Sequence, residues 1–180
     1  ALIKDRTAAK NREKNLTSPL LRRQIRQRLS SIESHLKEVE TAIRVLIDRD
    51  ESLRRKIAIL VSIPGIAERS ASALLIDMPE LGTLAAQEAA ALSGTAPLTR
   101  QSGKWAGKAF VSGGRVNVRK ALYMPALVAA RFNPDLKEKY ICLTSRGKPP
   151  KVALTAVMRK LIILANALIR DDRDWSPERA

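Results

Sequence analysis

Two serines have the surroundings of groups that work on a phosphodiester, because each precedes glycine in a basic stretch of the chain. Ser102 lies in the sequence QSG and Ser112 in SGG. In one interpretation these hydroxyls bind phosphate or cap turns. In the other, one serine attacks phosphorus while arginines stabilise the charge on the phosphate. The single histidine, His35, lies on a distant patterned helix, so most Ser–His mechanisms are excluded and the proton would pass to a metal-bound base, solvent or lysine.

Both serines belong to an acid-free block, residues 89–134, which contains cations and no Asp or Glu. Such a block favours a polyanion, of which nucleic acid is the commonest, and glycines let backbone N–H groups approach phosphate. A solvated basic surface is the alternative. Trp105 either stacks on a base or anchors the loop. The residues predicted to contact nucleic acid here are Arg100, Lys104, Trp105, Lys108, Arg115, Arg119 and Lys120.

Composition limits the class of protein. The net charge is +15, and a core with 45% hydrophobic but only 3% aromatic residues points to helices. One cysteine, Cys142, and one histidine exclude a disulfide framework and a Cys/His zinc site within one chain. No stretch resembles a signal peptide, and the apolar run at residues 161–168 is too short for a membrane span. We expect a cytoplasmic protein with no membrane partner.

Metal chemistry would need carboxylates that this sequence does not group together. A two-metal nuclease requires several convergent Asp or Glu residues, and the basic block has none. Asp171, Asp172 and Asp174 are interpreted as a solvated helix end. The chain starts without Met, inside a polar helical pattern, so we expect a fragment that lacks an N-terminal part, holds no cofactor and is inactive alone.

A coiled coil is predicted over residues 18–60. Ser18 and Pro19 mark a helix start, and residues 1–16 before them are expected to be helical. The alternative is a long amphipathic helix packed on its own domain, and the seam could pair within or between chains. Asp50 alone breaks the pattern; it fixes register, marks a bend or meets a basic partner. The spacing alternates between four and three along Ile25, Leu29, Ile32, Leu36, Val39, Ile43, Leu46, Asp50, Leu53, Ile57 and Leu60.

The next segment, residues 60–75, predicts a helix-hairpin-helix-like corner around the sequence IPGI. In that motif the amides after a turn glycine, here Gly65, contact a phosphate. Ala67 stands at the usual second glycine, so a purely structural corner is an equal alternative.

The remainder predicts a compact helical domain. We expect helices near residues 84–92, 136–143 and 152–170, the last buried, and a short strand at 110–111. Another helix starts near Val116, Pro125 should kink it or end its first part, and Asn133-Pro134 should break the chain. The tail after Asp171 should be frayed. The predicted fold is mainly α, with a coiled-coil segment (1–59), a compact domain with a Gly-rich basic loop (60–172) and a polar tail (173–180).

Taken together, several short blocks make the sequence resemble the C-terminal half of the IS110 family of insertion-sequence transposases, which includes Piv-type DNA invertases and bridge-RNA-guided recombinases. The resemblance covers the whole chain. The blocks occur in order: the IPGI turn, LSGTAP at 92–97, QSG at 101–103, SGGR at 112–115, RKALYMPA at 119–126 and MRKL at 158–161.

The resemblance implies a composite active site. An acidic domain of ribonuclease-H type, absent here, would bind Mg²⁺ in one subunit and face the serine of another. That serine would form a transient 5′-phosphoserine link to DNA, and the motif places it at Ser102, with Ser112 as second choice. DNA, a guide RNA and a second copy of the chain in a homodimer or higher oligomer are the implied partners, in the cytoplasm at the nucleoid.

Two other hypotheses stay open at this point. The first is a DNA- or RNA-binding and dimerisation module with no chemistry of its own. The second is a repair-type helix-hairpin-helix protein.

Overall fold

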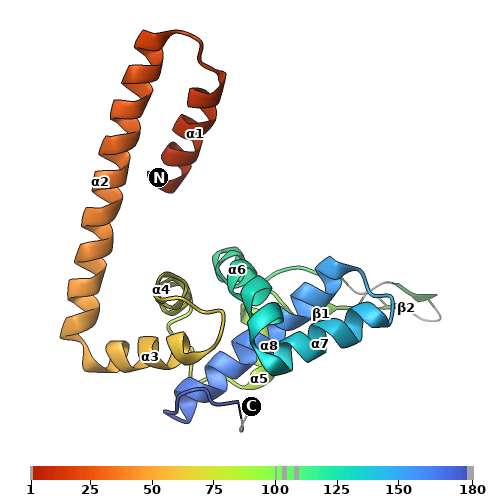
Figure 1. Cartoon of the computed structure of the whole chain (residues 1–180). Coiled ribbons are helices and arrows are strands. Elements are labelled where there is room, and N and C mark those ends of the chain that lie inside the picture. The colour runs from red at the N-terminus through yellow and green to blue at the C-terminus, as the bar shows by residue number, and fades with distance from the viewer. Residues whose placement is uncertain (1, 100, 103–104, 108–109, 178–180) are drawn as a thin grey trace. The chain divides into compact units, whose positions relative to one another are not determined.

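The computed structural model describes residues 2–99, 101–102, 105–107 and 110–177. These residues fall into two compact units, Ala1–Arg54 and Arg55–Ala180 (Figure 1). Both units are mainly helical, and the only strands in the described ranges are four strands of two residues each. The prediction of a mainly α fold is confirmed.

The first unit is a helical hairpin of α1 (Leu2–Asn15) and α2 (Pro19–Arg49), shown in red and orange in Figure 1. Pro19 begins α2 as predicted, since its fixed φ suits a first helical turn. The two helices pack antiparallel, with the Arg26–Glu13 ion pair at 2.9 Å and Lys10–Glu33 at 3.7 Å. Because α1 is less than half as long as α2, it covers only the N-terminal half of the longer helix.

Asp50 interrupts the predicted continuous helix. It ends α2 with an extended backbone, and α3 (Glu51–Ser62) begins at the next residue. The Asp50 carboxylate accepts the Leu53 backbone N–H at 3.0 Å, which satisfies one of the free donors in the first turn of α3. Of the three interpretations of Asp50, the break in the helix is the one seen locally, and the coiled coil itself stays a prediction.

Among the residues that the structure describes, the second unit contains five helices after α3: α4 (Glu68–Asp77), α5 (Ala86–Leu92), α6 (Val116–Phe132), α7 (Pro134–Ser145) and α8 (Pro150–Arg170). Helix α8 packs against α5, α6 and α7, and α4 packs on α6.

The helix α8 was expected to be buried, and it is. Leu161, Ile162 and Leu168 are fully enclosed. By length and composition this helix could cross a membrane, contrary to the expectation from the shorter apolar run. However, 56% of its apolar window is buried inside the protein, as in the core helix of a water-soluble domain.

Pro125 does not end its helix, whereas the break predicted at Asn133-Pro134 occurs. The helix α6 continues through Pro125 to Phe132, because the buried proline removes only one donor from a helix held by packing on both α4 and α8. The break at Asn133 is confirmed: its side chain accepts the Leu136 N–H at 3.2 Å and starts α7.

The segment after α8 is not frayed at its start, although the Asp172 and Asp174 side chains are 73% and 59% exposed. Arg55 of α3 donates to the carboxylates of Asp172 and Asp174, both at 2.8 Å. The backbone N–H of Trp175 donates to Ser62 Oγ at 2.8 Å. These contacts bind the segment after α8 to α3.

Candidate functional site

Four short strands in the glycine-rich basic stretch pair as two antiparallel ladders, and these strands, which we call the hairpin, extend away from the helices of the second unit (Figure 1). At its base, β1 (Pro97–Leu98) pairs antiparallel with β4 (Phe110–Val111), so the predicted strand is confirmed. Further out, β2 (Gln101–Ser102) pairs antiparallel with β3 (Trp105–Ala106), and Ser102 stands opposite Trp105. The fold therefore makes Ser102, the favoured serine, and Trp105 register partners in one outer ladder.

The other predicted site residues are distributed between the hairpin and α6. Ser112 is exposed just after β4, and Lys120 is exposed on α6. The hairpin thus separates Ser112 at its base from Ser102 in its outer ladder. Arg100, Lys104 and Lys108 lie outside the described residues.

Two glycines let the chain cross itself beneath the hairpin. Gly94 and Gly114 have φ of +64° and +62°, a region that L side chains avoid. A Cβ on Gly114 would lie 2.2 Å from the Gly94 nitrogen, so no side chain fits there. Beside this crossing, the Arg115 N–H donates to the Leu92 carbonyl at 2.7 Å. The crossing fixes where the hairpin leaves the helices.

Arg119 fastens both sides of that crossing. Its Nη1 donates to the Gly94 carbonyl at 3.2 Å and to the Gly113 carbonyl at 2.8 Å. Arg119 is one of the predicted nucleic-acid contacts. In this structure its guanidinium holds the protein backbone, and a phosphate contact stays a prediction.

Arg115, the N-cap residue of α6, forms a two-point ionic contact with Glu80. Its Nη1 donates to Glu80 Oε2 and to the Asp77 carbonyl, both at 2.8 Å, and its Nη2 donates to Glu80 Oε1. A two-point contact of this kind fixes direction as well as distance. The hydrogen bonds from Arg115 lower the pKa of Glu80 to about 2. The bond to Glu80 raises the pKa of Arg115 in turn.

The block that is acid-free in sequence is therefore not acid-free in space. Glu80 lies 35 residues before Arg115, on the segment between α4 and α5. Glu80 could not be predicted as a partner of Arg115, because nothing local in the chain links the two positions. Its role here is to neutralise one cation and to tie the base of the hairpin to the α4–α5 segment.

Two small polar residues in the LSGTAP block anchor the end of α5. Ser93 and Thr95 are almost wholly buried, and their hydroxyls lie 2.9 Å apart. Each also donates to the Ala90 carbonyl, at 3.0 Å and 3.3 Å. These bonds satisfy buried polar groups and hold the chain as it enters the hairpin.

Gly65 lies in the tight turn between α3 and α4, as the corner prediction requires. Its φ is +112°, and a Cβ would come 2.6 Å from the Pro125 carbonyl oxygen and 2.8 Å from the Ala129 nitrogen. Close packing of α6 therefore accounts for this glycine. The phosphate contact of the helix-hairpin-helix interpretation stays a prediction.

Comparisons with known proteins find similar sequences. Residues 57–141 match the model of a protein family described as "Transposase IS116/IS110/IS902 family". Over these 85 of its 180 residues the chain matches the IS116/IS110/IS902 transposase family. The family match spans the turn at Gly65, Glu80, the glycine crossing and the hairpin, so the resemblance inferred from the short blocks is confirmed.

Individual relatives of the transposase family also match. The "Pilin gene-inverting protein" of Moraxella bovis and that of Moraxella lacunata are each 29% identical over 142 residues, which is 77% of this chain and 44% of theirs. An "Insertion element IS110 uncharacterized 43.6 kDa protein" of Streptomyces coelicolor is 30% identical over 116 residues, 63% of this chain and 28% of its own. The chain thus spans less than half the length of these relatives.

A metal centre was not predicted within this chain of the transposase family. Across the described ranges no three His, Cys, Asp or Glu side chains come together as a metal would need. The Glu80 carboxylate at the base of the hairpin is occupied, since it binds Arg115. The described residues therefore do not fit a magnesium ion, and we place no ligand for one among them.

Proposed function

We propose that this chain is the C-terminal part of a DNA transposase or recombinase of an insertion sequence, which binds DNA and supplies Ser102 as the nucleophile for strand cleavage and exchange. The observation that carries the proposal is the family match over residues 57–141, a range that includes Ser102 on its hairpin. The name of the Moraxella relatives, gene-inverting protein, is consistent with rearrangement of DNA.

The proposed chemistry is an exchange of one phosphoester for another. The Ser102 Oγ forms a bond to phosphorus, and the bond from phosphorus to the 3′ oxygen of the neighbouring nucleotide breaks. The proton from Oγ leaves to solvent or a base, and the departing oxygen takes up a proton as a 3′-hydroxyl end. The DNA is then held by a 5′-phosphoserine link that the reverse reaction with another 3′-hydroxyl resolves, so phosphoester bonds are conserved.

The described residues would serve this reaction by orientation. A reacting group must be held close to its productive geometry, and contacts far from the chemistry can decide the rate. The bonds of Arg119 to Gly94 and Gly113 and of Arg115 to Glu80 hold the base of the hairpin that carries Ser102. We propose that these arginines position the serine, whichever of the other cations contact phosphate.

Further partners follow from the same proposal. Because the described residues do not fit Mg²⁺, we propose that the ion is bound by carboxylates outside this chain, as in the family's acidic domain. When bound, it would supply charge stabilisation at the phosphate. A guide RNA and a second copy of the chain are the other proposed partners, in the cytoplasm at the nucleoid.

The direct test is Ser102→Ala in the full-length protein with Mg²⁺ and its nucleic-acid partners. We expect strand cleavage to be abolished while DNA binding persists, with Ser112→Ala as the matched control that keeps cleavage. A hydroxyl that only contacts phosphate would instead cost on the order of 1 kcal/mol, a several-fold decrease in affinity, with cleavage still detectable.

A covalent adduct gives an independent measurement. DNA trapped with a suicide substrate and digested for mass spectrometry should carry a peptide modified at Ser102. Modification at Ser112 would show that Ser112 is the nucleophile, and the serine-link mechanism would still hold. If no adduct forms and cleavage survives removal of both serines, the serine-link mechanism fails. An unmodified chain that only binds nucleic acid and associates would favour the non-catalytic module.

A further inference from the structure

A second acid-free stretch lies outside the hairpin and outside the matched family region. Residues 142–170 include the α7–α8 connection and all of α8, and they contain no Asp or Glu. At the connection the sequence is RGKPPK, residues 146–151. We call these six residues the basic turn. It holds three cations, Arg146, Lys148 and Lys151, and such a group of like charges favours an anionic partner.

The basic turn has a defined backbone. The Gly147 N–H donates to the Thr144 carbonyl at 3.0 Å, and the Lys148 N–H donates to the Leu143 carbonyl at 3.1 Å. Gly147 has φ of +76°, the left-handed conformation that commonly ends a helix. Pro149 and Pro150 follow with restricted φ. A binding partner therefore meets cations on a backbone that is already folded.

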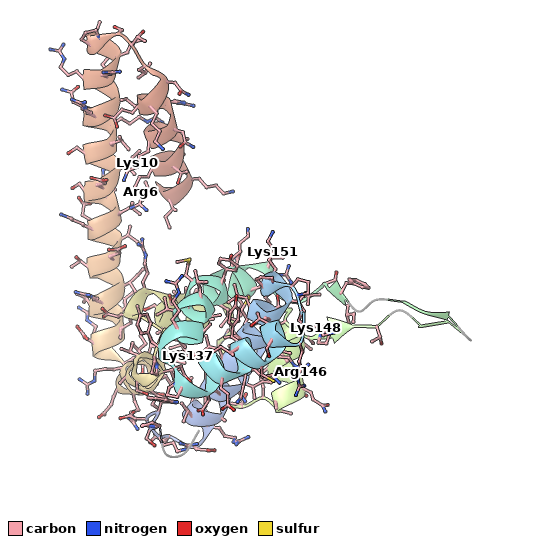
Figure 2. All side chains as sticks on the ribbon, turned by 45° about the vertical axis from the view of Figure 1, so that its right-hand side comes forward. Arg6, Lys10, Lys137, Arg146, Lys148 and Lys151 are labelled. Carbon is pink, nitrogen blue, oxygen red and sulfur yellow. The ribbon has the colours of Figure 1, made fainter. Side chains whose placement is uncertain are left out.

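The three cations of the basic turn are exposed and have no protein partner in the part of the chain that the structure describes. Figure 2 shows Arg146, Lys148 and Lys151 at the surface of the second unit. They contrast with Arg115 and Arg119, whose guanidinium groups bind a carboxylate or backbone carbonyls. Because no protein group in the described part of the chain pairs with these three side chains, they are available to bind an external anion.

The basic turn lies at the end of the second unit from which the hairpin extends, in the views of both Figure 1 and Figure 2. A linear polyanion that follows this end of the unit would meet the hairpin and the basic turn together. The turn contains no aromatic side chain. Binding of single strands relies on stacking of bases on aromatic rings, whereas duplex backbones are bound through phosphates alone.

We propose that the basic turn is a second contact with duplex DNA, in which Arg146, Lys148 and Lys151 bind backbone phosphates beside the hairpin. The inference rests on the proposed function for the choice of DNA as the polyanion. Such contacts set the position of the duplex and give no base specificity. They would hold the duplex while the hairpin carries Ser102 to one phosphate.

The test is a salt titration of duplex binding by the full chain, followed by fluorescence anisotropy. The variant carries Arg146→Gln, Lys148→Gln and Lys151→Gln. The slope of log K against log salt should become shallower by about 0.9 for each phosphate that the variant no longer neutralises, with roughly tenfold weaker binding per phosphate near 0.1 M salt. A swap of Arg146→Lys, Lys148→Arg and Lys151→Arg keeps the charge and should keep the slope.

The matched control removes three exposed cations from the first unit, with Lys14→Gln, Arg23→Gln and Lys37→Gln. It has the same net charge as the test variant, so it measures the effect of overall charge. Circular dichroism should show unchanged helix content in both.

Each outcome decides the inference. A decrease in slope in the test variant that exceeds the decrease in the control supports it. Equal decreases in both overturn it and leave the serine proposal standing, because Ser102 cleavage is measured separately. Weakened binding of duplex RNA with intact DNA binding overturns it in favour of an RNA contact. A parent chain that binds no duplex at low salt overturns it together with the DNA-binding part of the proposed function.

Discussion

At the scale of single residues, the base of the hairpin depends on one carboxylate. Glu80 receives both ends of the Arg115 guanidinium, and this contact lowers the pKa of Glu80 from 4.5 to about 2. A group with a depressed folded-state pKa stabilises the fold above its unfolded pKa. That stabilisation disappears as pH falls through the folded value. Both side chains are partly exposed, so solvent screens the pair.

We predict that Glu80→Gln removes an acid-dependent part of stability. The free energy of unfolding of the parent should fall between pH 4.5 and about pH 2 as Glu80 becomes protonated. The variant should be less stable near neutral pH and show a smaller fall over that window. Urea unfolding at a series of pH values measures this. Glu138→Gln, on the exposed face of α7, serves as control; identical curves for parent and Glu80→Gln would refute the prediction.

A second prediction at this scale uses neighbouring glycines. Gly113 and Gly114 both have positive φ, of +74° and +62°, but a Cβ on Gly113 meets nothing within 4 Å. Gly113→Ala should therefore cost only backbone strain, about 1–2 kcal/mol. Gly114→Ala should destabilise more, because its Cβ would lie 2.2 Å from the Gly94 nitrogen. Urea unfolding compares them, and equal destabilisation would show that the crossing is less tight than described.

At the scale of elements, α2 leaves apolar side chains without cover. Its N-terminal half packs on α1, where Leu29 and Ile32 are buried. Beyond α1, Val39 is 49% exposed and Leu46 is 63% exposed. These two belong to the four-three spacing of the predicted coiled coil. A second copy of the helix would bury them, which is why self-association stays our prediction for this element.

We predict that Val39→Lys with Leu46→Lys produces monomers from an associating parent chain, because an unpaired charge in an apolar seam is costly to bury. Since both positions are exposed in the single chain, the hairpin of α1 and α2 should stay folded. Sedimentation velocity measures the mass. Gln27→Lys with Thr41→Lys, also on exposed positions of α2, should leave association unchanged. A monomeric parent at high micromolar concentration would sink the idea.

At the scale of the whole molecule, the net charge is +15, and both units carry basic residues. The structure uses part of it internally. Arg55 binds the tail through Asp172 and Asp174, and Arg115 binds Glu80. Exposed cations such as Lys120 and those of the basic turn remain for an external polyanion.

We predict that the chain binds duplex DNA with steep dependence on salt and little preference for sequence. Release of counterions gives a slope of about −0.9 per phosphate neutralised, so several contacts should weaken binding strongly between low and physiological salt. Anisotropy with two unrelated duplexes of equal length checks both parts. A flat titration, or a large preference for one duplex, would contradict the prediction.

The sequence by itself determined those features that arise from neighbours along the chain. The break at Asn133 follows from a capping side chain next to proline, and burial of α8 follows from its apolar composition. The strand at Phe110–Val111 and the family blocks were equally readable. Periodicity, caps and composition act over a few residues, so no tertiary contact is needed to predict them.

Only the tertiary structure decided which groups meet. Glu80 meets Arg115 across 35 residues and Arg55 meets Asp172 across 117, and no local pattern records either distance. The same holds for the continuation of α6 through Pro125 and for Gly65 against that helix, since both depend on packing between helices. The sequence does not distinguish an arginine or lysine that binds a carboxylate of the protein from one that is available to phosphate. Only folding brings the carboxylate and the cation together.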